Sequence, residues 1–294
     1  MIHLKLSLMA LIWATSYPLG RYLAPYEAPY AIVVVRMYIA FAVLALLAWR
    51  AGEWQWRFSG ATWFRFLVLG VSGFCIHNLL MFIALEHTKA NVGAVINGAI
   101  PLAVVFLDYV IYRQKLRTAA LLGVTVCFIG TAVVISHGDL AELVAGRIGF
   151  GELLFVIGAC GWAIYTIAAR PLLATLPTRV VVAYPCLIGA ALVTPAFLVD
   201  FEDSIALLSD PVNLAIMVVQ SLLTVAFGFL WYYQGVKAIG AAGASVYTNL
   251  IPVFAVIIAA FTIGEIPDMP LLIGGAMVVG GLLFVNGVQA RDAT

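Results

Sequence analysis

Aromatic and hydrogen-bonding residues occur inside the apolar stretches of this sequence, at spacings that place them on one face of a helix. Trp13, Ser16 and Tyr17 follow the i, i+3, i+4 pattern in the first stretch. Trp162 and Tyr165 begin the same kind of pattern in the second half of the chain. Such rings can stack on another ring or attract an ammonium group, and the hydroxyls can donate or accept hydrogen bonds. These residues therefore predict noncovalent recognition of a small solute rather than bond-breaking chemistry.

Amide, imidazole and hydroxyl side chains lie deep in other apolar stretches, where anchoring at a membrane interface does not explain them. Amides without partners are costly in hydrocarbon, so we expect these faces to point inward to one cavity. A structural interpretation stays open for the hydroxyls, which often bond their own helix backbone. The predicted substrate-binding residues are Trp13, Tyr17, His77, Asn78, Met81, Asn97, Trp162, Tyr165, Tyr232, Ser245, Thr248 and Asn249.

Two prolines, Pro101 and Pro252, lie close to these polar faces. Proline lacks the backbone N–H, so each one frees a carbonyl about one turn upstream, near Asn97 and Thr248. We predict that both positions are kinks or hinges.

The elements that hold these faces must cross a lipid bilayer. Of the 294 residues, 64% are apolar and only 10% are charged, and the mean hydropathy is +1.09. A spanning helix needs about 20 apolar residues, so the chain has room for about ten such helices joined by short loops. We therefore predict an all-α membrane protein of ten transmembrane helices around a central cavity. The predicted spans are 4–23, 29–49, 63–84, 89–111, 118–136, 149–169, 179–199, 212–234, 241–263 and 270–288.

The charge distribution predicts the orientation of these helices. If the N-terminus is cytoplasmic, most basic residues fall on the cytoplasmic side and most acidic residues on the other side. We therefore predict that both termini are cytoplasmic. The net charge of +1 gives no reason to expect a nucleic-acid partner. The basic residues on the predicted cytoplasmic side are Lys5, Arg50, Arg57, Arg65, Arg113, Lys115, Arg117, Arg170, Arg179, Lys237 and Arg291.

The two halves of the sequence repeat one another. Residues 84–131 align with residues 235–282 at an offset of 151, which pairs Pro101 with Pro252. Each half holds an odd number of predicted spans, so the second half must enter the membrane in the opposite orientation. This five-plus-five inverted repeat suits alternating access, although a duplication that only built a stable bundle is the alternative. The two repeats, which together form one membrane domain, are predicted at 1–137 and 149–291.

Two ionisable side chains, Arg36 and His77, lie near the middle of predicted spans. Arg36 can bond carbonyls at a helix break, extend toward the interface, or meet the carboxylate of a solute, and these alternatives stay open. No acid occupies the midplane, so the carboxylate proton carrier of many pumps is missing. Either His77 couples protons, or the protein is a facilitator driven by the solute gradient, which is the alternative we favour.

Enzymatic and metal chemistry are not expected. The four histidines lie in different segments, and the sequence contains neither HExxH nor GxSxG. The four cysteines lie in apolar runs without CxxC spacing. We therefore expect no enzyme activity, no cofactor and no metal. Self-association is left open, because glycines at spacing seven permit helix packing within one chain or between two chains. These glycines are Gly123, Gly130, Gly274 and Gly281.

Together these features resemble the drug/metabolite transporter superfamily with paired EamA domains, over the full chain. The resemblance rests on the ten spans, the duplication, the Trp-Ala to Arg pattern at Trp13 to Arg21 and at Trp162 to Arg170, and the helices of Pro101 and Pro252. Within the superfamily, the stretches His77 to Met81 and Asn91 to Asn97 are similar to YddG-type aromatic amino-acid exporters.

This resemblance implies an exporter in the bacterial inner membrane, with a cavity formed by the first, third, fourth, sixth, eighth and ninth helices. The implied cargo is an aromatic or neutral amino acid, so the expected partners are this solute and the lipid bilayer. Neutral amides and carbonyls can hold a zwitterion without burying net charge. The alternative is an exporter of another metabolite or drug, such as a purine or a cationic drug, with proton coupling through His77. Glu265 matches an acid that the superfamily often has after the ninth helix, and we expect it to have a helix-end role.

Overall fold

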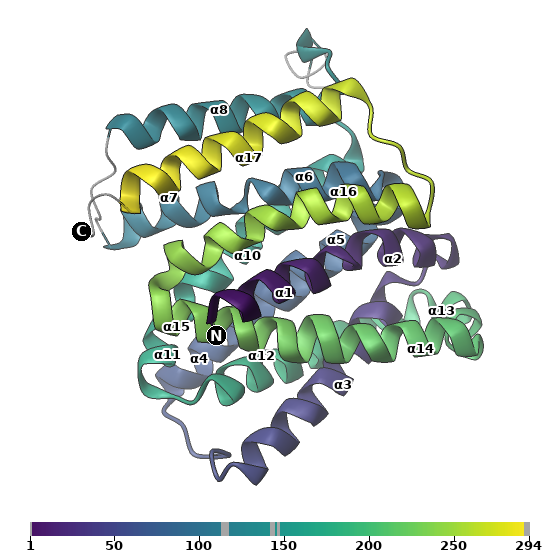
Figure 1. The fold of residues 1–294 in the computed structure, drawn as a ribbon. Helices are drawn as coiled ribbons and strands as arrows, with labels where there is room; N and C mark the ends of the chain where they lie inside the picture. The colour runs from purple at the N-terminus through teal and green to yellow at the C-terminus, as the bar shows by residue number, and fades with distance from the viewer. Residues whose placement is uncertain (1, 113–117, 142–144, 146–147, 291–294) are drawn as a thin grey trace.

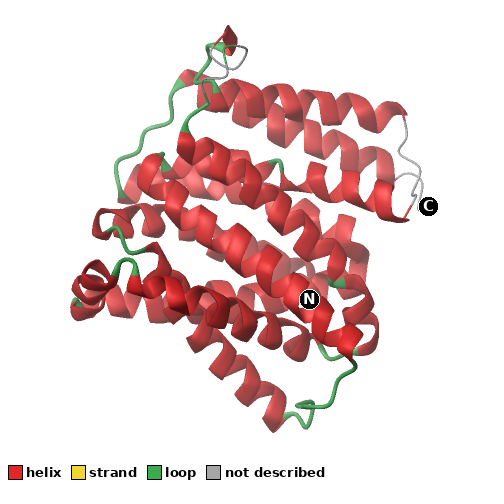
Figure 2. Cartoon of the chain, turned by 180° about the vertical axis from the view of Figure 1, so that it is seen from behind, coloured by secondary structure: helices red, strands yellow, loops and turns green. Residues whose placement is uncertain are grey.

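The computed structural model describes residues 2–112, 118–141, 145 and 148–290, and every regular element among them is helical (Figure 1, Figure 2). The all-α prediction is therefore confirmed for this part of the chain. The first half contains α1 (Ile2–Ala14), α2 (Ser16–Leu23), η1 (Ala24–Tyr26), α3 (Pro29–Arg50), α4 (Gly60–Leu69), η2 (Gly70–Leu79), α5 (Leu80–His87), α6 (Ala90–Gly98), α7 (Ile100–Tyr112) and α8 (Thr118–Ile135). The second half contains α10 (Phe150–Ala168), α11 (Arg170–Thr175), α12 (Thr178–Val193), η3 (Thr194–Leu198), α13 (Phe201–Ser209), α14 (Pro211–Gln220), η4 (Ser221–Gly228), α15 (Phe229–Ser245), η5 (Val246–Asn249), α16 (Leu250–Thr262) and α17 (Met269–Ala290).

Long apolar helices dominate the fold. Within the described residues, seven helical segments are long and apolar enough to cross a membrane, which makes the chain a multi-pass membrane protein. They are Pro29–Arg50, Gly60–His87, Ala90–Ile111, Phe150–Thr175, Thr178–Leu198, Pro211–Ala241 and Gly243–Thr262. The other predicted spans coincide with α1 and α2, with α8 and with α17, which fall outside this set. That these helices also cross the membrane stays a prediction.

The first predicted span is divided at Thr15, between α1 and α2. Pro18 has no N–H, and its ring crowds the carbonyl of Ala14, so the backbone ladder is interrupted there. The division falls between Trp13 and Tyr17, two of the predicted binding residues. It therefore sets the angle at which the two rings leave the helix.

Two of the long helices contain a π-helical segment, in which backbone hydrogen bonds run between residues i and i+5. These segments are η2, Gly70–Leu79, and η4, Ser221–Gly228. Their first residues are 151 positions apart, which is the offset that aligns the two halves of the sequence. Wider turns of this kind change the register of the side chains and leave backbone groups for other partners, and they are frequent at functional sites.

Both prolines that predict kinks follow an interruption of a helix. α6 ends at Gly98 and α7 begins at Ile100, just before Pro101. In the second half η5 ends at Asn249, just before Pro252. A Cβ atom built on Gly98 would lie 2.7 Å from Cγ of Pro252, so the two interrupted helices touch at this point. Bending at either proline stays a prediction.

The spaced glycines pack α8 against α17, which lie side by side in Figure 1. A Cβ atom on Gly130 would lie 2.6 Å from the carbonyl oxygen of Gly274. At the next contact along the pair, a Cβ atom on Gly281 would lie 2.6 Å from the carbonyl oxygen of Gly123. Because the backbone of the facing helix occupies the Cβ position, only glycine fits here. These glycines therefore serve helix packing within the chain.

The most enclosed span is the one that begins with α10. In the Phe150–Thr175 segment, 67% of the apolar window is buried, the largest share among the seven spans. A Cβ atom on Gly161 would lie 2.7 Å from the carbonyl oxygen of Ser72, so α10 approaches the backbone of η2 closely. This contact holds Trp162, the next residue, against the π-helical segment of the first half.

Candidate functional site

A cavity lies between residues of both halves, at the middle of the long helices. The volume of this cavity is about 60 Å³, which holds a few water molecules and is below the range of small-molecule pockets, so a solute enters only after the helices move apart. The predicted binding residues on its wall are Trp13, Tyr17, His77, Asn78, Met81, Asn97, Trp162 and Thr248. The other wall residues, which were not among the predicted binding residues, are Ser16, Arg36, Ile100, Thr224, Phe229 and Ile251.

Aromatic rings form one side of the cavity. The indole of Trp13 meets that of Trp162 edge-on, with 5.1 Å between ring centroids and an interplanar angle of 87°. Phe229 packs on both, at 5.5 Å from Trp13 and 5.2 Å from Trp162. The imidazole of His77 lies 4.8 Å from the ring of Trp162. Trp13, Phe229 and His77 all contact Trp162, which is therefore the centre of the aromatic wall.

Several polar groups of the wall are held by their neighbours. Asn97 donates from Nδ2 to the hydroxyl of Tyr17 at 2.9 Å. Nδ1 of His77 lies 3.0 Å from the carbonyl oxygen of Gly158 and donates to it, because a carbonyl can only accept. Oδ1 of Asn97 is buried and has no hydrogen-bond partner among the described residues. The wall therefore offers this oxygen as an acceptor to a ligand.

Each π-helical segment has a carbonyl that is bonded by a side chain of the cavity wall. Asn78 donates from Nδ2 to the carbonyl oxygen of Gly73 at 2.8 Å. Trp13 donates from Nε1 to the carbonyl oxygen of Thr224, also at 2.8 Å. Gly73 and Thr224 are 151 positions apart, so the two bonded carbonyls are related by the repeat offset. An unpaired backbone group is costly in the membrane, and these bonds therefore fix the orientations of Asn78 and Trp13.

Several predicted binding residues are not on the cavity wall: Tyr165, Tyr232, Ser245 and Asn249. Tyr165 and Tyr232 are fully buried and pack against Trp162, with ring centroids at 5.3 and 5.5 Å. Tyr165 lies nearly one turn beyond Trp162 on α10, past the cavity. The faces of Tyr232, Ser245 and Asn249 were predicted with an α-helical period. Tyr232 follows the π-helical turns of η4, whereas Ser245 immediately precedes the 3-10 segment η5 and Asn249 ends it, so that period does not describe the local winding.

Thr224 and Phe229 are two wall residues that we had not predicted to bind. Thr224 lies eight residues, about two helical turns, before the predicted residue Tyr232, so extending that face upstream would have found it. Phe229 follows Thr224 by five residues, the spacing that a π-helical turn brings together. Gly228 itself makes room for the aromatic wall, because a Cβ atom there would overlap the indole of Trp13.

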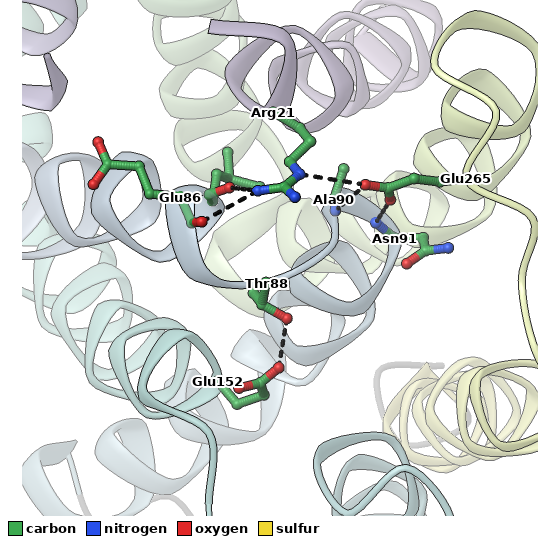
Figure 3. A network of polar contacts seen from close by, with 8 residues as sticks. Arg21, Glu86, Thr88, Ala90, Asn91, Glu152 and Glu265 are labelled. Carbon is green, nitrogen blue, oxygen red and sulfur yellow. Dashed lines mark hydrogen bonds and ion pairs between the residues drawn. The ribbon is translucent and has the colours of Figure 1, made fainter. Parts of the chain in front are cut away.

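A network of polar contacts joins the helix ends near Arg21 (Figure 3). Arg21 donates from Nη1 to two carbonyl oxygens at the end of α5, at 2.7 and 3.2 Å. Its Nε lies 3.8 Å from Oε1 of Glu265. The carboxylate of Glu265 also accepts from the backbone N–H groups of Ala90 and Asn91, at 3.3 and 3.2 Å. Glu265 therefore caps the N-terminus of α6, which is the helix-end role expected for it.

A second link at the same end also joins the two halves (Figure 3). The hydroxyl of Thr88 donates to the buried carboxylate of Glu152. Nε2 of His137 lies 3.8 Å from the same carboxylate. We refer to these contacts and the network of Arg21 and Glu265 together as the Arg21 end.

The opposite end of the first span carries different contacts, here called the Lys5 end. Lys5 donates from Nζ to Oε1 of Gln234 at 3.0 Å. The imidazole Nδ1 of His3 lies 2.5 Å from the hydroxyl of Tyr247. Both contacts join α1 to the second half.

Among the basic residues predicted to be cytoplasmic, four lie outside the described residues: Arg113, Lys115, Arg117 and Arg291.

The family of the chain follows from comparison with known proteins. A family model described as the EamA-like transporter family matches residues 1–136 and 149–287. The chain belongs to this family. As the sequence predicts, this EamA-like protein has two EamA segments and is a transporter rather than an enzyme. It is 28% identical to the uncharacterized transporter YyaM of Bacillus subtilis, with 98% of this chain and 95% of that protein covered.

Two further comparisons cover nearly the whole length of the chain. The probable terminal-alkyne amino-acid exporter of Streptantibioticus cattleyicolor is 24% identical, with 96% of this chain and 92% of that protein covered. A crystal structure superposes with a TM-score of 0.67 over 98% of both chains, at 20% sequence identity. The latter likeness is evidence for the fold alone.

Proposed function

We propose that this EamA-like transporter exports aromatic or neutral amino acids across the inner membrane of a bacterium. The observation that carries the proposal is the cavity between the halves, whose wall combines aromatic rings with neutral hydrogen-bonding groups. Aromatic faces suit rings and ammonium groups, and amides and hydroxyls suit a zwitterion. The relative named as a probable terminal-alkyne amino-acid exporter is in line with this cargo.

The proposed architecture is a five-plus-five inverted repeat of ten transmembrane helices, with repeats at 1–137 and 149–291 and both termini in the cytoplasm. Two observations support it. The family model matches two separate segments, and the π-helical segments begin 151 positions apart. In this orientation the Arg21 end faces outward and the Lys5 end faces the cytoplasm.

The proposed mechanism is alternating access. The cavity lies between the linked Arg21 end and the linked Lys5 end, so opening one end at a time would expose it to one side of the membrane. The interrupted helices that touch at Gly98 and Pro252 are the elements proposed to bend. No carboxylate lines the cavity among the described residues, and Nδ1 of His77 is bonded to a carbonyl. A solute gradient is therefore the proposed driving force.

Counterflow in liposomes tests the cargo. Liposomes that contain the purified protein are loaded with unlabelled phenylalanine or methionine. Uptake of the labelled amino acid is then measured, with amino acids, purines and cationic dyes as competitors. We expect exchange of the amino acids and competition by their aromatic and neutral analogues. Exchange of a purine or a dye without exchange of amino acids would favour the alternative cargo. Accumulation of the labelled amino acid under an imposed pH gradient would contradict transport driven by the solute gradient alone and would favour proton coupling through His77.

The first site prediction concerns Asn97, whose Oδ1 is free to accept from the solute. We expect Asn97→Ala to lower phenylalanine exchange about tenfold, because a hydrogen bond to a charged group contributes about 1.5–3 kcal/mol. Asn213→Ala is the control, since Asn213 is also buried but is not on the cavity wall. Exchange at the wild-type rate by folded Asn97→Ala protein would remove Asn97 from the site.

A second prediction concerns the closure at the Arg21 end. Glu265→Ala removes both the ion pair with Arg21 and the cap of α6. We expect a membrane-impermeant maleimide to label Met81→Cys from outside about two to thirty times faster, since the lost contacts contribute about 0.5–2 kcal/mol. The labelling is done in protein without its native cysteines, and size-exclusion chromatography monitors folding.

The control for this experiment breaks an ion pair elsewhere. Nη1 of Arg179 lies 2.8 Å from Oε1 of Glu53, so Glu53→Ala also removes a salt bridge. We expect this variant to leave labelling of Met81→Cys from outside unchanged. Equal acceleration by both variants would mean general loosening of the protein, and would contradict a specific closure at Glu265.

A further inference from the structure

Arg36 is a charge of the cavity wall that the proposed function has not used. It lies on α3, is only 2% exposed and lines the cavity. A guanidinium stays ionised in proteins, so this side chain brings a full positive charge into the membrane domain. The ion pairs among the described residues are those of Arg21, His137 and Arg179, and none of them includes Arg36.

The hydrogen bonds of Arg36 are incomplete within the described residues. Nη2 donates to the hydroxyl of Thr224 at 2.7 Å, and this hydroxyl donates in turn to the carbonyl oxygen of Gln220 at 2.6 Å. Cζ lies 4.8 Å from the centroid of the Phe82 ring. Nε and Nη1 are buried without a partner. Because a buried charge with unpaired donors is strongly unfavourable, this arrangement calls for an anionic ligand.

The two structural alternatives for Arg36 do not fit this geometry. An arginine that extends to the membrane interface would carry its guanidinium toward solvent, whereas this guanidinium meets Thr224 in the interior of the Pro211–Ala241 span. An arginine that stabilises a helix break would donate to freed carbonyls, whereas Arg36 donates to a hydroxyl. The carbonyl of Thr224 is already bonded by Trp13.

We propose that Arg36 binds the carboxylate of the transported solute through charge-assisted hydrogen bonds from its free guanidinium nitrogens. The inference rests on the proposed function and narrows its substrate class to solutes that carry a carboxylate. Oδ1 of Asn97 lies on the same wall without a partner and accepts from the ammonium group. Trp13 and Trp162 contact the side chain. A cationic drug has no carboxylate and is repelled by Arg36.

The test uses ligands that differ in one charged group: phenylalanine, 3-phenylpropionate without the ammonium group, and phenethylamine without the carboxylate. Each is titrated into purified wild-type protein, and the ligand-induced rise in Tm is measured. We expect phenylalanine and 3-phenylpropionate to raise the Tm and phenethylamine to leave it unchanged. Stabilisation by phenethylamine as strong as that by phenylalanine, or no stabilisation by either carboxylate, would overturn the inference.

Variants of the arginine then identify the group responsible. We expect Arg36→Gln to weaken binding of both carboxylates about tenfold or more, and Arg36→Lys to keep part of it, because lysine retains the charge without the planar fork. Arg179→Gln removes an arginine outside the cavity and should bind like the wild type. If Arg36→Gln does not fold, Thr224→Val replaces it, with several-fold weaker binding of the carboxylates expected. If a folded Arg36→Gln protein binds 3-phenylpropionate as tightly as the wild type does, the inference is overturned. The same holds for Thr224→Val where it replaces Arg36→Gln.

Counterflow distinguishes failure of this inference from failure of the proposed function. If the protein does not exchange amino acids, but 3-phenylpropionate stabilises it only when Arg36 is present, the cargo is wrong and the carboxylate site stands. If the wild type exchanges phenylalanine and Arg36→Gln does so at the same rate, the exporter stands and the carboxylate site is wrong.

Discussion

Trp162→Ala is expected to lower the exchange of labelled phenylalanine in liposomes by at least about tenfold. Trp162 joins Trp13, Phe229 and His77 into one wall, with ring centroids 4.8 to 5.2 Å from its own. Aromatic pairs of this kind contribute about 0.5–1.5 kcal/mol each beyond burial, and about 1.4 kcal/mol corresponds to a tenfold change. Alanine removes the surface on which a solute ring stacks and also releases its neighbours.

The same substitution leaves a cavity, so stability must be measured beside flux. Truncating a buried tryptophan costs about 3–5 kcal/mol, and we therefore include Trp162→Phe, which keeps a ring and should retain an intermediate rate. Trp49→Ala is the control, because Trp49 is 69% exposed at the end of α3. A folded Trp162→Ala protein with wild-type flux would contradict a solute site on the aromatic wall.

Helical periodicity in the sequence predicted much of the cavity wall. Trp13 and Tyr17 are four residues apart and both lie on it, as do His77, Asn78 and Asn97. The prediction works in these helices because polar side chains in an apolar stretch must find partners away from lipid. That requirement does not depend on knowing how the helices pack.

The same reasoning did not separate wall residues from buried ones in the Pro211–Ala241 span. Along α15 the α-helical period selected Tyr232, but after the π-helical turns of η4 it is Phe229 that lies on the wall, with Tyr232 behind it. No residue type or spacing in this stretch signals the change of winding. It becomes recognisable only through tertiary contacts, such as the bond from Trp13 to the carbonyl of Thr224.

Some features needed the packed structure because their meaning depends on a distant partner. The alternatives for Arg36 could be separated only when its guanidinium was found beside Thr224, 188 positions away. The spaced glycines of α8 and α17 were likewise compatible with packing inside one chain or between two chains. In both cases local sequence determines which contact is possible, while the fold determines which partner makes it.

Gly274→Leu is expected to destabilise the protein strongly. A Cβ atom at this position would lie 2.6 Å from the carbonyl oxygen of Gly130 and 2.6 Å from Cγ2 of Val134. Overpacking typically costs about 1–3 kcal/mol, and the cost here should reach the upper end of that range because the obstacle is backbone. We expect a clear drop of the Tm in detergent, with separation of α17 from α8.

Gly280→Leu on the same helix is a matched control for Gly274→Leu. It makes the same gain in intrinsic helix propensity, but nothing lies within 4 Å of a Cβ atom at Gly280. The difference in Tm between the two variants therefore isolates the contact between α17 and α8. A similar Tm for both, with a change of oligomeric state in Gly274→Leu, would mean that the glycines pack against a second chain. A lower Tm for Gly274→Leu at unchanged oligomeric state assigns them to the interior of one protein.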